Sequence, residues 1–127
     1  KAGQGCFCSD TARAFLDMSD FLAFMDLAIK ADAPVGTFNI ASGEAHSIKE
    51  IFDLVAEYLG LGRIDVPIVP PAADDVPVVS LDASATLQSF GWQAKVSFAD
   101  TIRRQLQWYD QYGISDVYSH LKAPAAK

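Results

Sequence analysis

The sequence predicts an α/β fold on two observations: strand-like runs that lead into amphipathic helices, and turn residues that separate these units. Residues 37–59 are the clearest case, an apolar strand followed by a loop of small residues and then a helix. Apolar side chains recur in that helix at a spacing that places them on one face, while Lys49 and Asp53 fall on the other. A strand that passes its chain to such a helix is typical of an α/β layer.

The composition is that of an ordinary folded domain, with 50% hydrophobic and 20% charged residues. The formal net charge is −6 and there is no run of Lys and Arg, so no nucleic-acid partner is expected. No apolar run approaches the roughly 20 residues that a membrane-spanning helix needs. Without a signal-peptide pattern either, the sequence predicts a cytoplasmic protein with no membrane partner.

The first third of the chain predicts a loosely held start and an apolar helix. Residues 1–12 are small and aperiodic and are expected to form a loop or a frayed end, and residues 13–16 a short extended piece. Asp17 or Ser19 is expected to cap a helix over residues 20–30. Apolar side chains lie on almost every side of that helix. It therefore needs cover on more than one side, from its own domain or from a sheet elsewhere.

The central unit is expected to contain a strand over residues 37–40 and a helix over residues 48–59. Asn39 interrupts the strand and is expected to bond to neighbouring backbone. Ser47 followed by Glu50 is a capping box, in which each residue can satisfy an amide at the start of the helix.

Shorter elements follow. Pro67 and Pro77 limit the strands that contain them to edge positions or short pairings. Ser97 with Asp100 is a second capping signal, and Gly91 is expected to end the helix before it. The expected elements are strands within 66–69 and 76–81, a helix from Asp82 or Ser84 to about 89, with Trp92 folded back onto the core, and a helix over 98–112.

The sequence by itself offers little metal chemistry. Cys6 and Cys8 are the only cysteines and read as ordinary thiols of a reducing compartment. Two thiols do not complete a zinc site, and His46 and His120 do not have metal-ligand spacing relative to them. No metal site is predicted.

Three further features bear on catalysis or binding. Tyr118 and Lys122 have the Tyr-x-x-x-Lys spacing of a catalytic pair but fall in an expected tail, so they are not assigned a role. Asp74 and Asp75 are adjacent loop carboxylates, which usually hydrate separately. Arg13 is an isolated cation that could hold a phosphate or form a surface salt bridge, and both interpretations remain open at this level.

An ordered series of motifs now points to a family. The series is Arg-Ala-Phe-Leu-Asp-Met-Ser-Asp at 13–20, Phe-Asn-Ile-Ala-Ser-Gly at 38–43, Ser-Ile-Lys-Glu at 47–50, Asp75, Ser-Leu-Asp at 80–82 and Phe-Gly-Trp-Gln-Ala-Lys-Val-Ser at 90–97. In this order and spacing, from Arg13 to Tyr109, the chain resembles the C-terminal part of NAD-dependent nucleotide-sugar epimerases and dehydratases. These enzymes are the extended short-chain dehydrogenase/reductases.

The resemblance implies the C-terminal part of a Rossmann-type fold. Residues 13–46 would supply the last Rossmann strand and helix, residues 47–112 a small, mostly helical lobe over the substrate, and residues 113–127 a tail. The implied substrate is a nucleotide sugar, and NAD is the implied cofactor of a full-length parent. The missing N-terminal Rossmann half, or another copy of the chain, would be the partner.

The resemblance also implies two substrate-binding residues. Arg13 falls on the arginine that contacts the sugar nucleotide's diphosphate, and Asp75 ends the loop that matches the family's Arg-Pro-Gly-Asp. This sequence departs from the family at Ala14, where an Asp is usual, and at Ala72, which replaces a second phosphate-binding Arg. Diphosphate binding is therefore expected to be weak or differently arranged.

The family's Gly-rich cofactor turn and its catalytic Tyr-Lys pair precede the region of resemblance, so no catalytic or cofactor-binding residue is predicted. This chain alone is expected neither to bind NAD nor to catalyse. A first residue that is Lys, not Met, agrees with the expectation of a C-terminal fragment. The alternative is a stand-alone, non-enzymatic binding or assembly module derived from the family.

Overall fold

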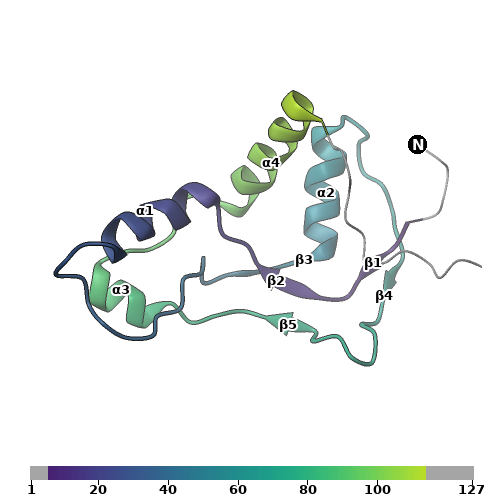
Figure 1. Ribbon diagram of the computed structural model, residues 1–127. Helices are drawn as coiled ribbons and strands as arrows, with labels where there is room; N and C mark the ends of the chain where they lie inside the picture. Colours follow the sequence, from purple (N-terminus) through teal and green to yellow (C-terminus); the bar gives the residue numbers. More distant parts are fainter. Residues whose placement is uncertain (1–5, 114–127) are drawn as a thin grey trace, which may run out of the picture.

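The computed structural model describes residues 6–113 of the chain and has a mixed α/β fold, as the sequence predicts (Figure 1). The elements in chain order are β1 (Cys8–Ser9), β2 (Ala12–Ala14), α1 (Met18–Ala28), β3 (Ala45–Ser47), α2 (Ile48–Tyr58), β4 (Ile68–Val69), β5 (Val78–Val79), α3 (Ser84–Phe90) and α4 (Phe98–Tyr112).

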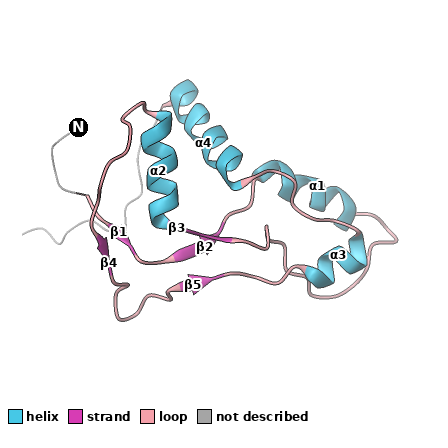
Figure 2. Cartoon of the chain, turned by 180° about the vertical axis from the view of Figure 1, so that it is seen from behind, coloured by secondary structure: helices cyan, strands magenta, loops and turns pink. Residues whose placement is uncertain are grey.

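Within residues 6–113 the strands form two small sheets. β1 and β4 pair in parallel. In the other sheet, β2 lies between β3, which is antiparallel to it, and β5, which is parallel. Helix α2 leaves directly from β3 and packs against α4. Figures 1 and 2 both show this helix pair rising from one side of the strands, with α1 and α3 together at the other end of the molecule.

The helix starts follow the capping signals of the sequence. At α2 the capping box is complete: the Glu50 amide donates to Ser47 Oγ at 3.1 Å, and the Ser47 amide donates to Glu50 Oε2 at 2.7 Å. At α4 the Asp100 amide donates to Ser97 Oγ, but the Asp100 carboxylate accepts from the Ser97 hydroxyl, not from its amide. At α1 the capping residue is Asp17, whose carboxylate accepts a hydrogen bond from the Ser19 amide.

The prediction of a strand over residues 37–40 was wrong, because these residues form no strand in the structure. The strand that precedes α2 is β3, in the segment expected as a loop. A strand needs a neighbouring strand to which its backbone groups can hydrogen-bond. Residues 37–40 have no such neighbour among the described residues, and hydrogen bonds from side chains hold them in place. The Asn39 amide group donates to the Asp82 carbonyl at 3.0 Å, as expected of a bridging Asn, and the Thr86 hydroxyl donates to the Asn39 carbonyl.

Several other elements differ from their predicted bounds by a few residues. The segment 1–12 is not a loop throughout, because it contains β1 and the start of β2. The helix expected over 20–30 is α1, which begins and ends two residues earlier. β4 and β5 occupy only part of 66–69 and 76–81, since the prolines next to them lack an amide donor. The division into lobes at 13–46 and 47–112 stays a prediction.

Aromatic side chains form the core between α1 and α3. Phe24 makes edge contacts with Phe90 at 5.0 Å and Trp92 at 5.4 Å between ring centroids, and Phe38 contacts Phe90 at 5.0 Å. Trp92 is buried, so it folds back onto the core as expected. The buried apolar residues of the described chain are Cys8, Phe24, Ala41, Ala56, Val66 and Trp92.

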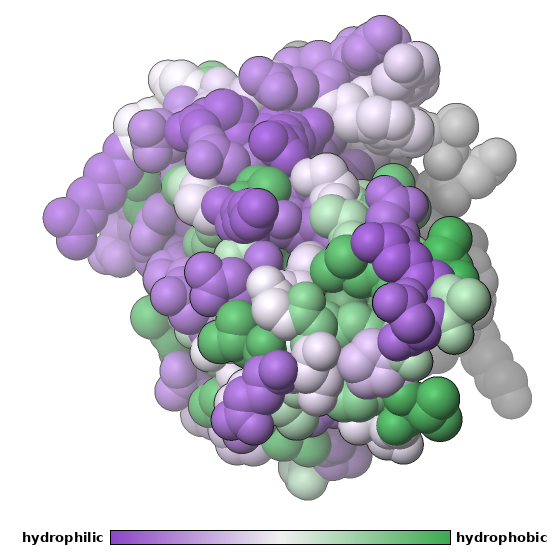
Figure 3. All heavy atoms as spheres, turned by 90° about the vertical axis from the view of Figure 1, so that its left-hand side faces the viewer, coloured by the Kyte–Doolittle hydropathy of each residue, from purple (hydrophilic) through white to green (hydrophobic). Residues whose placement is uncertain are grey.

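The outer face of α1 remains open in this structure. Met18 and Leu22 of α1 are 67% and 56% exposed, and Ile29, which caps the C-terminal end of α1, is 73% exposed. Figure 3 views the molecule from the left-hand side of Figure 1, where α1 and α3 lie, and shows apolar residues scattered among polar ones on that face. Among the described residues, no helix is long and apolar enough to cross a membrane.

Candidate functional site

The two residues predicted to bind substrate lie together. Arg13 Nη2 is 2.6 Å from Asp75 Oδ1, although the residues are 62 positions apart. Arg13 Nη1 donates to the Ala12 carbonyl at 2.8 Å and weakly to the Pro77 carbonyl at 3.4 Å. The Arg13 and Asp75 side chains are 30% and 38% exposed. The guanidinium is therefore held in place while it stays accessible to solvent.

Parallel pairing of β2 with β5 produces this arrangement. Arg13 lies opposite Val79, and the Ala12 amide donates to the Pro77 carbonyl at 2.8 Å. The loop that enters β5 therefore passes beside Arg13 and delivers Asp75 to it. The Asp75 amide in turn donates to the Ala72 carbonyl at 3.0 Å, which closes a turn in that loop.

The ion pair orients Arg13 more than it stabilises the fold. Partly exposed pairs contribute about 0–1 kcal/mol, because water screens them and the side chains lose freedom. The three contacts to described residues use three of the five N–H donors of the guanidinium. The other two donors have no acceptor among the described residues.

A histidine lies across the sheet from Arg13. His46 of β3 is directly opposite Arg13 in the antiparallel register. Its ring stacks on Phe98 of α4, with centroids 3.8 Å apart and planes 2° apart. Nδ1 is 3.3 Å from Glu50 and Nε2 is 3.5 Å from Glu44. The sequence analysis weighed His46 only as a zinc ligand; nothing in a three-residue strand signals its pairing register.

Two carboxylates near these elements have a lowered pKa. For Glu50, the hydrogen bonds from the Ser47 amide and hydroxyl lower the pKa most, and the contact with His46 adds to them. For Asp17, burial alone would raise the pKa, but the hydrogen bonds from Ser19 and the charge of Arg104 lower it below its usual value. Both carboxylates therefore stay ionised at neutral pH.

Metal-binding groups do not gather in this part of the chain: among residues 6–113 no cluster of three or more His, Cys, Asp and Glu side chains could hold an ion. Cys6 is exposed and Cys8 is buried, and neither is in a disulfide. Tyr118, Lys122 and His120, which entered the sequence analysis, lie outside the described residues.

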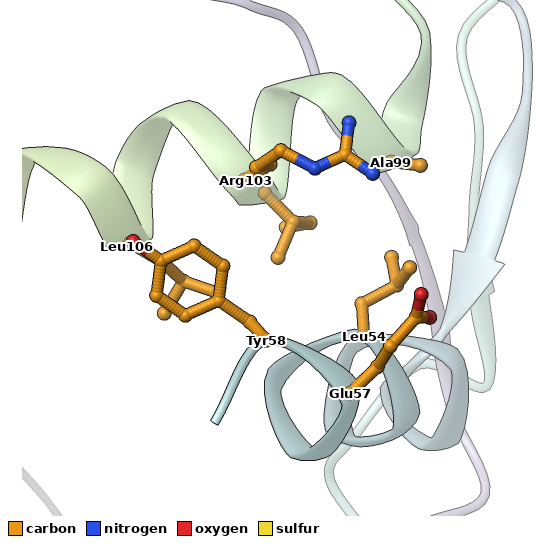
Figure 4. A pocket seen from close by; sticks show the side chains of 7 residues that line it. Leu54, Glu57, Tyr58, Ala99, Arg103 and Leu106 are labelled. Carbon is orange, nitrogen blue, oxygen red and sulfur yellow. The ribbon is translucent and has the colours of Figure 1, made fainter. Parts of the chain in front are cut away.

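A small pocket of about 110 Å³ lies between α2 and α4. Figure 4 shows that the Tyr58 side chain of α2 points toward Leu106 of α4, while the Leu54 side chain of α2 points toward the Arg103 side chain of α4. The Tyr58 hydroxyl donates to Asp110 at 2.6 Å, which raises the Tyr58 pKa and ties the helices together. The pocket is too small for a nucleotide and is a packing gap between the helices.

The known proteins that match this chain belong to one class, enzymes that act on nucleotide sugars. No family model matches the sequence. The crystal structure of the Bordetella bronchiseptica enzyme WbmG in complex with NAD and UDP matches with 60% sequence identity and a TM-score of 0.83, over 97% of this chain and 40% of that one. The chain is therefore related to the NAD-dependent nucleotide-sugar epimerase/dehydratase family. It matches only part of the length of the family's members.

Individual curated relatives are more distant. UDP-glucose 4-epimerase of Neisseria gonorrhoeae is 33% identical over 100 residues, which are 72% of this chain and 29% of that protein. GDP-L-fucose synthase 1 of Arabidopsis thaliana is 31% identical over 98 residues, which are 76% of this chain and 29% of that protein. The chain thus spans 29% of the length of each of these relatives.

Proposed function

We propose that this chain is the C-terminal, substrate-binding part of an NAD-dependent nucleotide-sugar epimerase/dehydratase and is not catalytically competent alone. The single observation that carries the proposal is the Arg13–Asp75 pair, which joins the two residues that the resemblance assigns to substrate. The relation to WbmG, whose crystal structure holds NAD and UDP, supports the same ligand class.

In this proposal Arg13 binds the diphosphate of a nucleotide sugar. A guanidinium donates two parallel hydrogen bonds to phosphate oxygens, and such charge-assisted bonds contribute roughly 1.5–3 kcal/mol. Asp75 and the carbonyls of Ala12 and Pro77 restrict the guanidinium before ligand arrives, which lowers the entropy lost on binding. Because Ala72 replaces the family's second arginine, the affinity of this site is modest.

The described residues do not fit NAD. A dinucleotide site needs a Gly-rich turn between a strand and the helix that follows it. Here Gly60 and Gly62 come after helix α2, at its C-terminal end. NAD therefore belongs, in this proposal, to a part of the parent enzyme other than residues 6–113, and no step of the chemistry is assigned to this chain.

The partner in this proposal is the N-terminal Rossmann half, or a second copy of the chain. The open face of α1 supports it, because an isolated domain rarely leaves Met18, Leu22 and Ile29 in water together. Residues 37–40 also support it: they have no strand partner among the described residues, and the sheet of a larger protein would supply one.

A second candidate is a stand-alone binding module without chemistry. Ala72 in place of a phosphate-binding arginine favours it, because that substitution weakens the grip on substrate. The two functions share the Arg13 site and differ in whether a Rossmann half must join the chain before turnover occurs.

Calorimetric titration of the purified chain with UDP-glucose and with NAD tests the proposal. UDP-glucose is expected to bind weakly and NAD not at all. Arg13→Ala should weaken UDP-glucose binding about 10- to 100-fold, the equivalent of roughly 1.5–3 kcal/mol. Arg13→Lys should recover only part of the loss, because an ammonium lacks the planar fork.

Arg63→Ala is the matched control, since Arg63 is an exposed arginine in the segment between α2 and β4. It removes the same charge and should leave the affinity unchanged. If Arg13→Ala binds UDP-glucose as tightly as the unsubstituted chain, Arg13 does not bind the diphosphate and only forms a surface ion pair with Asp75. Tight binding of NAD by these 127 residues would refute the fragment proposal itself.

A further inference from the structure

His46 and Arg13 share one face of the β2–β3 sheet. Residues directly opposite each other in an antiparallel pair project to the same side, with Cβ atoms about 5 Å apart. The register places His46 directly opposite Arg13. An imidazole is thus a fixed neighbour of the cation that we assign to the diphosphate.

The His46 ring is held from several sides. Phe98 stacks on its face at 3.8 Å, and Phe15, which follows β2, packs on Phe98 at 5.4 Å. Glu50 uses one carboxylate oxygen for His46 and the other for the Ser47 amide, so α2's own cap fixes that carboxylate. The ring therefore stays beside the sheet and cannot swing away without disrupting these contacts.

Charged groups reach this site from each neighbouring element. Glu44 and Glu50 face the two ring nitrogens. Arg13 comes from β2, and Lys95, from the segment before α4, lines the same hollow as His46. Asp100 in the first turn of α4 is engaged by Ser97 and Arg103. Without a proton on the ring, the carboxylates of Glu44 and Glu50 make this side of the Arg13 site negative.

We propose that His46 makes anion binding at Arg13 depend on pH: a protonated ring strengthens the binding of a nucleotide diphosphate, and a bound diphosphate favours the protonated ring. This inference rests on the proposed function, which supplies the anion. Histidine is the side chain whose charge ordinarily changes between pH 8 and 5. The two effects must be equal in size, because linkage between two binding events is reciprocal.

The size of the effect follows from distance and solvent. Opposite unit charges on the order of 10 Å apart in water attract each other enough to change a dissociation constant about two-fold. A diphosphate diester carries two charges, so a full positive charge on the ring would tighten binding about four-fold at low salt, which is the upper limit of the expected change. The gain should shrink at high ionic strength, since the Debye length falls to about 3 Å at 1 M salt.

The experiment is titration of the full chain with UDP-glucose at pH 8, 7 and 6 in 20 mM buffer. UDP-glucose is the chosen probe because its phosphates are diesters whose charge is constant over this range. His46→Gln keeps a polar, planar side chain and removes the titrating ring. His120→Gln is the matched control, because His120 is the other histidine of the sequence.

The expected result is tighter binding at pH 6 than at pH 8, by at most about four-fold, for the unmodified chain and for His120→Gln, and no pH dependence for His46→Gln. Circular dichroism checks that each variant keeps its helices. Binding that is independent of pH, or equally pH-dependent in His46→Gln, refutes the inference and leaves the proposed function standing. Absence of any UDP-glucose binding at all three pH values refutes both.

Discussion

Asp20 is expected to be the most important polar residue for the stability of this chain. It is only 5% exposed, and its Oδ2 accepts the amides of Lys95 at 3.0 Å and Val96 at 2.9 Å. These contacts join the first turn of α1 to the segment before α4, 75 and 76 positions away. Removing the carboxylate leaves two amides without their acceptor in a partly buried place.

The magnitude follows from the two bonds. Hydrogen bonds to a charged group contribute roughly 1.5–3 kcal/mol each, so Asp20→Ala should lower the free energy of unfolding by about 3–6 kcal/mol. That is a large share of the roughly 5–15 kcal/mol that stabilises a typical domain. Asp20→Asn keeps an oxygen that can accept both amides but loses the charge, and it should cost about 1–2 kcal/mol.

The assay is urea denaturation monitored by tryptophan fluorescence, since Trp92 is buried beside Phe24, which lies on α1 together with Asp20. Asp26→Ala is the matched control, because Asp26 lies on α1 and is exposed. It should change the free energy of unfolding by less than about 0.5 kcal/mol. If Asp20→Ala and Asp26→Ala unfold at the same urea concentration, the reasoning from these two hydrogen bonds is wrong.

Two further predictions concern helix starts. Ser47→Ala removes the capping oxygen of α2 and should cost about 0.5–2 kcal/mol, measured by urea denaturation; Ser47→Thr should restore most of it, and an Ala variant as stable as the parent would contradict the capping role. The lowered pKa of Asp17 means that its ionised form stabilises the fold. That stabilisation is present at neutral pH and is lost as pH falls through the lowered value, below about pH 4. The stability difference between the parent and Asp17→Asn should therefore narrow in acid-denaturation curves below pH 4, and a gap that persists to pH 2 would argue against it.

Local signals predicted the helices well and the strands poorly. Ser47 with Glu50 is a complete start signal within four residues, so α2 was placed within one residue at each end. Residues 37–40 also carry apolar side chains, interrupted by Asn39, yet among the described residues they pair with no strand. A helix makes its hydrogen bonds within itself, whereas a strand exists only where another strand meets it.

The candidate site was predicted in part. Arg13 and Asp75 were named from the resemblance, and the structure brings them to 2.6 Å of each other. Their role in binding substrate stays a prediction. His46 was missed as a neighbour of Arg13, because its position depends on the β2–β3 register, and strands of three residues are too short for alternation to reveal register.

The sequence by itself determined the α/β class, the capped starts of α2 and α4, the resemblance to a family and the excess of apolar residues on α1. Tertiary structure alone decided that the loop before β5 delivers Asp75 to Arg13, that His46 stacks on Phe98, and that Asp20 binds the amides before α4. The physical reason is reach: caps and helical faces depend on residues three or four positions apart, while these contacts join residues about 50 to 75 positions apart, whose meeting depends on how the whole chain packs.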